Sequence, residues 1–327
     1  MDTQAVRDHT ARVKLAGYAT DPSRWRLPAA ELTETERDQS AARWRSATEA
    51  LDWLHGQLPD TLLAQRRALH AGLYTECWLC ADGMVGLFSA EKSAPLARRC
   101  YDLGIIAAQR QGERDQEATL HTRTGVSLAA QAAPDQAISW YASAWELHEA
   151  TDHRLGLASV AECWARALID MADYQQAMDK VTKARELFEA AGHHRGALIA
   201  DRRLGLLHGR SGRTEQAVSV LTPLADQFTA IGDEWMAAKT RAELAEVHIA
   251  SGAGQAALAE IAMADAALTR LGAVWDAARM HELRADARAA LSEPAAAREE
   301  LLAAYRAFTD LGDYDRADRL SQRLVAG

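Results

Sequence analysis

The chain repeats itself every 40 residues, and this period constrains its fold more than any other feature of the sequence. One register holds glycine, at Gly192, Gly232, Gly272 and Gly312. A second register holds alanine, at Ala97, Ala137, Ala177, Ala217, Ala257 and Ala297, and a third holds small residues, at Gly125, Ala165, Gly205, Ala245 and Ala285. Agreement in three registers excludes coincidence, and a fixed period of this length is typical of solenoids and other repeat architectures.

Each repeat has the pattern of two helices. A short break divides the unit, at Ala133–Asp135, Ala172–Asp173, Ser211–Gly212, Ser251–Gly252 and Ser292–Pro294, and a connection that contains glycine, such as Ala230–Asp233, ends it. The chain is 48% hydrophobic but only 6% aromatic, so alanine, the best helix former, supplies much of the apolar content. Small residues at fixed positions let two helices approach closely. We therefore predict an all-α fold of antiparallel helix pairs.

The second helix of each unit adds a further pattern. A larger apolar residue follows the alanine of the second register by four positions, at Tyr141, Val181, Leu221, Ile261 and Leu301. Together with the small residue of the first helix, this series resembles the tetratricopeptide repeat. The resemblance implies a right-handed superhelical solenoid. The usual unit of that family is shorter than 40 residues, so helices or connections are expected to be extended here.

The repeats do not fill the chain, and we expect four segments. Residues 1–43 are predicted to be an irregular, partly helical arm, and residues 44–76 an atypical hairpin that caps the solenoid and breaks at Leu58–Asp60. Six tetratricopeptide-like repeats follow over residues 77–313, and residues 314–327 are expected to form a C-terminal capping helix.

The stretch that starts ALDWLHGQLPDTLLAQRRALHAGLYTECWLC and leads into hairpins such as DYQQAMDKVTKARELFEAAGHHRGAL resembles another known region. It is similar to the C-terminal tetratricopeptide region of the large actinobacterial antibiotic regulators of the SARP/NB-ARC type. That resemblance implies a sensor or interaction arm. The sequence has no Gly-rich phosphate loop, and 40 upstream residues are too few for a winged helix, so we expect neither the ATPase nor the DNA-binding module.

Charge and composition restrict the partners and the compartment. The 46 acidic and 37 basic residues give a net charge of −9, which disfavours direct binding to nucleic acid. No run of 18 apolar residues exists, and the N-terminus is too polar for a signal peptide, so we expect no membrane contact and a cytoplasmic location. Four cysteines are too few for a disulfide framework, which agrees with a reducing compartment.

Few residues suggest chemistry. Cys77 and Cys80 have the spacing of redox and zinc sites, but their place in a predicted helix favours simple packing. His193 and His194 suit solvated loop positions better than metal ligands, and His208 and His248, which share a repeat position, are interpreted as structural. Hydrolase, metalloprotease, phosphate-loop and dinucleotide motifs are all missing. We therefore predict no enzyme activity, no catalytic residue, no metal and no cofactor.

The groove of such a solenoid is lined by its first helices, and the period assigns residues to it. The predicted groove residues are Glu162, Arg166, Asp170, Arg202, Arg210, Lys239, Glu246, Arg279, Glu282 and Asp286. Four of them would form a basic stripe, Arg166, Arg202, Arg210 and Lys239, which suits an acidic segment or a C-terminal carboxylate. The alternative is that these cations pair with Glu162, Asp170 and Glu246 on neighbouring turns and only keep the groove soluble.

Two functions are compatible with this surface. The first is a protein-interaction scaffold or accessory regulatory protein that binds a partner polypeptide in the groove. The alternative is a regulator of a specialised-metabolite pathway that senses a small ligand or peptide there. A scaffold needs only an open surface, whereas a sensor needs an enclosed pocket with convergent polar groups. Homodimerisation through hairpin edges is compatible with both.

Overall fold

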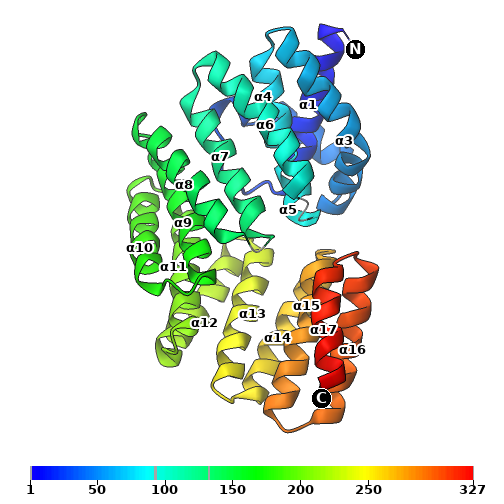
Figure 1. Cartoon of the computed structure of the whole chain (residues 1–327), viewed down its shortest axis with the longest axis vertical. Coiled ribbons are helices and arrows are strands. Elements are labelled where there is room, and N and C mark those ends of the chain that lie inside the picture. The colour runs from blue at the N-terminus through cyan, green and yellow to red at the C-terminus, as the bar shows by residue number, and fades with distance from the viewer. Residues whose placement is uncertain (1, 92–93, 132, 327) are drawn as a thin grey trace. The chain divides into compact units, whose positions relative to one another are not determined.

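The computed structural model describes residues 2–91, 94–131 and 133–326 (Figure 1). Within these residues every regular element is a helix, as the periodicity predicted. The chain divides into two compact units, which we call unit 1 (Met1–His193) and unit 2 (His194–Gly327). Each unit consists of helices that pack against their neighbours in sequence. The all-α prediction is thus confirmed, whereas the division into two units was not expected.

Unit 1 holds the N-terminal helices and the first repeats. Its helices are α1 (Thr3–Thr20), the 3-10 helix η1 (Pro28–Ala30), α2 (Glu34–Arg43), α3 (Ala47–His70), α4 (Tyr74–Gly83), α5 (Val85–Glu91), α6 (Ala94–Gln111), α7 (Arg114–Ala129), α8 (Pro134–Glu149), α9 (Arg154–Asp170) and α10 (Tyr174–Ala190). From α4 onward the helices alternate between first helices (α4, α7 and α9) and second helices (α6, α8 and α10) of the repeats, and the short α5 lies between α4 and α6 outside this alternation.

Unit 2 continues the same alternation. Its helices are α11 (His194–Arg210), α12 (Thr214–Ala230), α13 (Glu234–Ala250), α14 (Gly254–Arg270), α15 (Val274–Ala290), α16 (Pro294–Asp310) and α17 (Tyr314–Ala326). The first helices are α11, α13, α15 and α17. Helix α17 stands where a C-terminal capping helix was expected at 314–327; the last residue of that range lies outside the described part of the chain.

The 40-residue period is two 20-residue halves. Each helix from α9 to α16 has 17 residues, and three-residue turns join them. Every turn has one residue with positive φ, and these residues are 20 apart from Asp152 to Gly312. At Gly192, for example, the amides of Gly192 and His193 donate to the carbonyls of Glu189 (3.0 Å) and Phe188 (2.9 Å), a Schellman ending. The helices, not the connections, therefore lengthen the unit beyond the usual 34 residues.

Side chains at one position of the repeat cap the N-termini of the first helices. The Asp233 carboxylate accepts a hydrogen bond from the amide of Met236 (3.2 Å), and Asp313 accepts from Arg316 (3.3 Å). His153, in the same register, accepts from the amide of Gly156 through Nδ1 (3.0 Å). Such N-caps satisfy helix amides that have no partner inside the helix.

The small-residue register is where paired helices touch. A Cβ atom added to Gly125 would lie 2.5 Å from the ring of Tyr141, and one added to Gly205 would lie 2.4 Å from Leu221. Ala165, Ala245 and Ala285 in the same register are at most 1% exposed. The larger apolar residue of the second helix thus packs directly on the small residue of the first, which is the reason for both registers.

The predicted break at Leu58–Asp60 is wrong. Helix α3 runs without interruption from Ala47 to His70, with Pro59 inside it. Proline removes one helical hydrogen bond, a cost that packing can offset. One face of α3 is buried on both sides of Pro59, from Leu54 through Thr61 to Ala68, and α3 packs against α1 and α4. The partner of α3 therefore comes from the N-terminal arm and from α4, not from within residues 44–76.

The N-terminal arm is more ordered than its sequence indicates. Helix α1 packs against α3 and α4, and its Val13 and Ala16 are fully buried in one hydrophobic cluster with Leu54. At the crossing of α1 and α4 the backbones nearly touch, because a Cβ atom added to Gly17 would lie 2.3 Å from the carbonyl oxygen of Gly83. Helix α1 is thus part of the core of unit 1.

Candidate functional site

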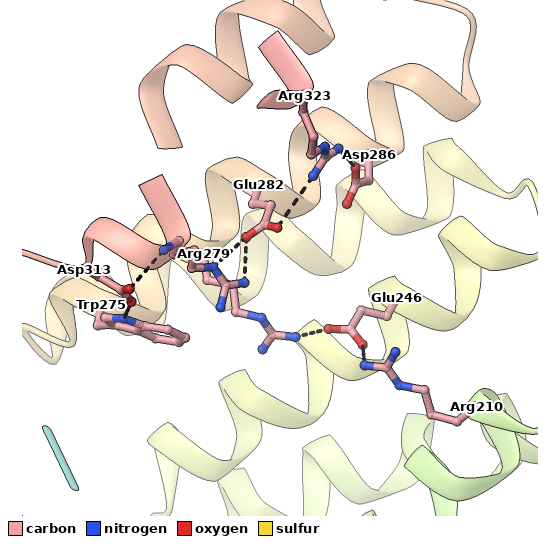
Figure 2. Close-up of polar contacts among 9 residues, drawn as sticks. Arg210, Glu246, Trp275, Arg279, Glu282, Asp286, Asp313 and Arg323 are labelled. Carbon is pink, nitrogen blue, oxygen red and sulfur yellow. Dashed lines mark hydrogen bonds and ion pairs between the residues drawn. The ribbon is translucent and has the colours of Figure 1, made fainter. Parts of the chain in front are cut away.

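Charged side chains on the first helices of unit 2 form a set of ion pairs in two groups, both of which include residues of α15 (Figure 2). We call it the charge ladder; it consists of Arg210, Glu246, Arg279, Glu282, Asp286, Arg316 and Arg323. Arg210 on α11 and Arg279 on α15 both contact the carboxylate of Glu246 on α13, Arg210 at 3.3 Å. These two contacts link three successive first helices.

The second half of the ladder joins α15 to α17. Arg316 donates two hydrogen bonds to Glu282, from Nη2 at 2.6 Å and from Nε at 2.9 Å. Arg323 lies 3.6 Å from the other oxygen of Glu282 and also contacts Asp286. Ladder side chains range from 21% exposed, for Arg279, to 55%, for Arg210. The charges therefore remain in contact with solvent.

Two tryptophans accompany the ladder. The indole Nε1 of Trp275 donates to Asp313 (2.9 Å, Figure 2), and that of Trp235 donates to Asp276 (3.0 Å). Trp235 is 39% exposed, and the Lys239 ammonium lies 4.2 Å from the centre of its ring. Burial lowers the pKa of Lys239 to about 8, and the attraction of Asp276 opposes that shift without cancelling it. An exposed tryptophan beside cations is a common anchor for a binding partner.

The structure corrects the prediction for Arg202. Its side chain is only 3% exposed, and Nη1 lies 2.5 Å from Oε1 of Glu243, whose side chain is 7% exposed. Arg202 therefore points at α13 rather than into an open groove. The physical reason is that residues of one register lie on the same side of the helix, but a long side chain reaches whichever partner the neighbouring helix supplies. The predicted basic stripe loses this member.

The predicted groove residues of unit 1 pair locally. Arg166 contacts Asp170 one turn later on α9 (3.0 Å), and both side chains are exposed, at 44% and 40%. Glu162, one turn before Arg166, is partly buried and lies beside the thiol of Cys163 (3.6 Å). The Arg166–Asp170 pair follows the alternative interpretation, in which the charges neutralise one another.

The cysteines behave as core residues. Cys77, Cys80 and Cys100 are fully buried, and all four cysteines are free thiols. Burial raises the pKa of Cys80 to about 12, partly opposed by its hydrogen bond with Thr10, and it raises the pKa of Cys77 and Cys100 as well. A thiol that stays protonated is a poor nucleophile and a poor metal ligand, so the geometry favours the packing interpretation.

A histidine and carboxylate cluster appears that the sequence did not indicate. Asp115, His148 and His153 bring one ligand atom each within 4.8 Å of one another. These atoms are already engaged: Nδ1 of His148 donates to Asp115 (3.0 Å), Thr151 donates to the same oxygen (2.6 Å), and His153 caps α9 through Gly156. Burial lowers the pKa of His148 to about 4. We interpret the cluster as a structural link between α7, α8 and α9.

Sequence reasoning missed the arginines of α17. Arg316 and Arg323 hold Glu282 and Asp286, but only the acidic members were singled out. The signal is present in the spacing, because the ladder contacts join residues 33 to 41 apart. This separation is close to the 40-residue repeat period. A search for opposite charges at that distance would have found them.

None of the helices in the described part of the chain has the length and apolar character needed to span a bilayer. Comparison with protein-family models gives no match, and comparison with curated proteins gives none.

Solved structures with the same helical architecture are found. A Rap protein complexed with competence and sporulation factor is 11% identical and has a TM-score of 0.60; the match covers 99% of this chain and 98% of that one. Aspartyl phosphate phosphatase F from Bacillus subtilis is 10% identical, with a TM-score of 0.56 and coverage of 100% and 94%. BtubC (BKLC) from P. vanneervenii is 16% identical, with a TM-score of 0.53 and coverage of 68% and 92%. At such identities the likeness shows a shared fold, and the resemblance to the actinobacterial regulators stays a hypothesis.

Proposed function

We propose that the chain is a protein-interaction scaffold that binds an acidic or carboxylate-terminated polypeptide segment along the charge ladder of unit 2. The observation that carries this proposal is the ladder itself, which holds four arginines against three carboxylates in a chain of net charge −9. These guanidinium groups lie on α11, α15 and α17, three of the four first helices of unit 2. An anionic segment is the partner that this local charge favours.

The energetics of the ladder support an exchangeable surface. Partly exposed ion pairs contribute only about 0–1 kcal/mol each to stability, so a partner can replace Glu246 as the ligand of Arg210 or Arg279 at small cost. Guanidinium groups can bind carboxylates through two hydrogen bonds at once, and Arg316 already directs both Nε and Nη2 at one oxygen, Oε2, of Glu282. Trp235 adds an exposed aromatic anchor in the same unit. The resemblance to the antibiotic regulators supports an accessory regulatory role for such a scaffold in the cytoplasm.

The test is selection of peptides from a random display library on the full-length protein, followed by affinity measurement on the winners. We expect selected peptides to be rich in Asp and Glu or to need a free C-terminus, and to lose at least tenfold in affinity for Arg279→Glu. Arg270→Glu is the matched control, because Arg270 carries the same charge on the second helix α14 and is 66% exposed. Peptides without carboxylates, or an equal loss in both variants, would contradict the proposal.

Arg202→Glu, the variant that the sequence alone suggests, does not serve this purpose. It would place two carboxylates together in the buried position beside Glu243. Loss of binding in that variant would report loss of folding, not loss of contact.

A further inference from the structure

Residues 21–27, which connect α1 to η1, lie against the first helices of unit 1. Arg24 forms a bidentate contact with Asp82 on α4, at 2.9 and 2.8 Å, and a further hydrogen bond with its carbonyl oxygen at 3.3 Å. The ring of Trp25 lies 5.7 Å from that of His153 at the start of α9. We call residues 21–27 the inner segment. It contacts the repeats through two large side chains rather than through a helix.

Trp25 lines a recess whose other walls are mostly small side chains. Thr119 and Thr122 of α7, with Gly156 and Ser159 of α9, line it together with Arg123 and His148. Trp25 therefore lies against side chains of α7 and α9.

The repeat period identifies the face on which this recess lies. Thr119 and Ser159 share their register with Lys239 and Arg279, and Asp82 shares its register with Glu282. These are the positions that carry long charged side chains beside the ladder of unit 2. Unit 1 has small hydroxyl residues at the equivalent places, which leaves space for the indole of Trp25. The inner segment thus covers in unit 1 the face that carries the charge ladder in unit 2.

Asp82 gives this face a defined chemical preference. Its side chain is 7% exposed, and a buried carboxylate needs a hydrogen-bonded cation. Burial alone would raise the pKa of Asp82, but the guanidinium groups of Arg24, foremost, and of Arg123 and Arg26 together outweigh that effect and lower it. Arg26 is held differently, by the carbonyl oxygens of Gly17, Asp21 and Arg24 within α1 and the segment itself. The face therefore selects one arginine, for Asp82, and one aromatic ring beside it.

We propose that the first-helix face of unit 1 is a binding site for a partner polypeptide with an arginine followed by an aromatic residue, and that the inner segment occupies this site in cis. The occupant is inferred from the charge of Asp82 and from the shape of the recess that holds Trp25. The site belongs to unit 1 and does not depend on the charge ladder. A tethered segment competes at an effective concentration in the millimolar range, so an outside peptide binds well only after the segment is released.

The probe is a fluorescent peptide with the sequence of residues 20–28, TDPSRWRLP, titrated into the full-length protein. We expect at least tenfold tighter binding to the variant Arg24→Ala/Trp25→Ala than to the wild type. Adding Asp82→Asn to that variant should weaken binding at least tenfold, because the guanidinium loses its carboxylate. The added change keeps the shape of the side chain and removes a carboxylate that Arg24→Ala leaves buried without its partner. A peptide with alanine in place of both arginine and tryptophan is the control ligand.

A second variant frees the N-terminal end of residues 23–27 without changing the site. A protease recognition sequence inserted between Pro22 and Ser23, which are both exposed, allows the chain to fold first and to be cut afterwards. The helical circular dichroism signal verifies that each protein is folded. Tighter peptide binding after cutting supports the proposal. A folded, cut protein that does not bind the peptide overturns the proposal, and so does equal binding when position 82 is Asn. Dimer formation by the cut protein in light scattering overturns the assignment to a partner polypeptide in favour of a second copy of this chain.

Discussion

Arg202 on α11 and Glu243 on α13 form an ion pair with an N–O distance of 2.5 Å that solvent barely reaches. Both residues belong to unit 2 and lie on neighbouring first helices. Removing one partner of a buried pair leaves the other charge without compensation, whereas breaking an exposed pair changes little. Loss of one partner of an arginine–glutamate pair is therefore costly where the pair is buried and nearly neutral where it is exposed.

We expect Arg202→Ala to lower the free energy of unfolding by about 3–5 kcal/mol, as measured by urea denaturation. Arg210→Ala is the control, since Arg210 is 55% exposed and contacts Glu246 at the surface, and its cost should be within about 1 kcal/mol. The double variant Arg202→Met/Glu243→Leu should recover most of the loss. Equal effects of the two single variants would contradict the burial of the pair.

Ala172 is expected to be a weak point that glycine corrects. It ends α9 with a φ of +61°, where glycine stands at Gly192, Gly212, Gly232 and other turns. The left-handed conformation costs a residue with a Cβ about 1–2 kcal/mol. Glycine avoids this cost, but its greater conformational freedom in the unfolded state offsets about 0.4–1 kcal/mol of the gain. Ala172→Gly should therefore stabilise the protein by about 0.5–1 kcal/mol in thermal or urea unfolding. The reverse change, Gly252→Ala, should destabilise by a similar amount; a stabilising Gly252→Ala would refute the argument.

The crossing of α1 and α4 should not tolerate one added methyl group. A Cβ atom on Gly17 would lie 2.3 Å from the backbone oxygen of Gly83, and backbone does not move aside as a side chain can. We expect Gly17→Ala to cost at least about 2 kcal/mol and to increase hydrogen exchange in α1. Gly56→Ala is the matched control, because nothing lies within 4 Å of that position in the middle of α3. Helix propensity predicts a gain of about 0.5–1 kcal/mol there.

His148 should make stability depend on pH. Burial lowers its folded pKa from 6.5 to about 4, with Asp115 opposing and His153 adding to the shift. Between pH 6.5 and pH 4 His148 binds a proton in the unfolded chain but not in the folded chain. Its contribution to the free energy of unfolding is therefore fully present above pH 6.5 and declines as the pH falls towards 4. One pKa unit corresponds to about 1.4 kcal/mol, which gives a loss of about 2 kcal/mol by pH 5.

The His148→Gln variant isolates this effect, because it removes the titrating group. Glutamine should destabilise the protein at pH 7.5, but the difference in unfolding free energy between variant and wild type should shrink by about 2 kcal/mol at pH 5. A difference that stays constant across this range would show that His148 does not titrate as its burial requires.

Much of the architecture could be predicted from sequence because it depends on local interactions. The glycine register ends the helices, small residues such as Gly205 mark the closest contact within a pair, and the apolar residues of the second helix fill the space beside them. Each of these requirements acts over a few residues or across one hairpin, and each repeats every 40 residues. A repeated local requirement leaves a periodic signal in the sequence.

The candidate sites depend on contacts between residues far apart in the sequence, and the 40-residue period alone did not predict these contacts. Whether Arg202 is buried and Arg210 exposed depends on which side chain the next first helix places opposite each of them. Pro59 remains helical because α1 and α4 supply packing that its own segment lacks. Trp25 lies against α7 and α9 because Thr119 and Ser159 happen to be small there. The amino-acid sequence by itself determined the helices of the repeats and their pairing, since these need only neighbours in the chain. The tertiary structure decided which charges meet and where the inner segment lies, because those contacts join side chains that no local pattern connects.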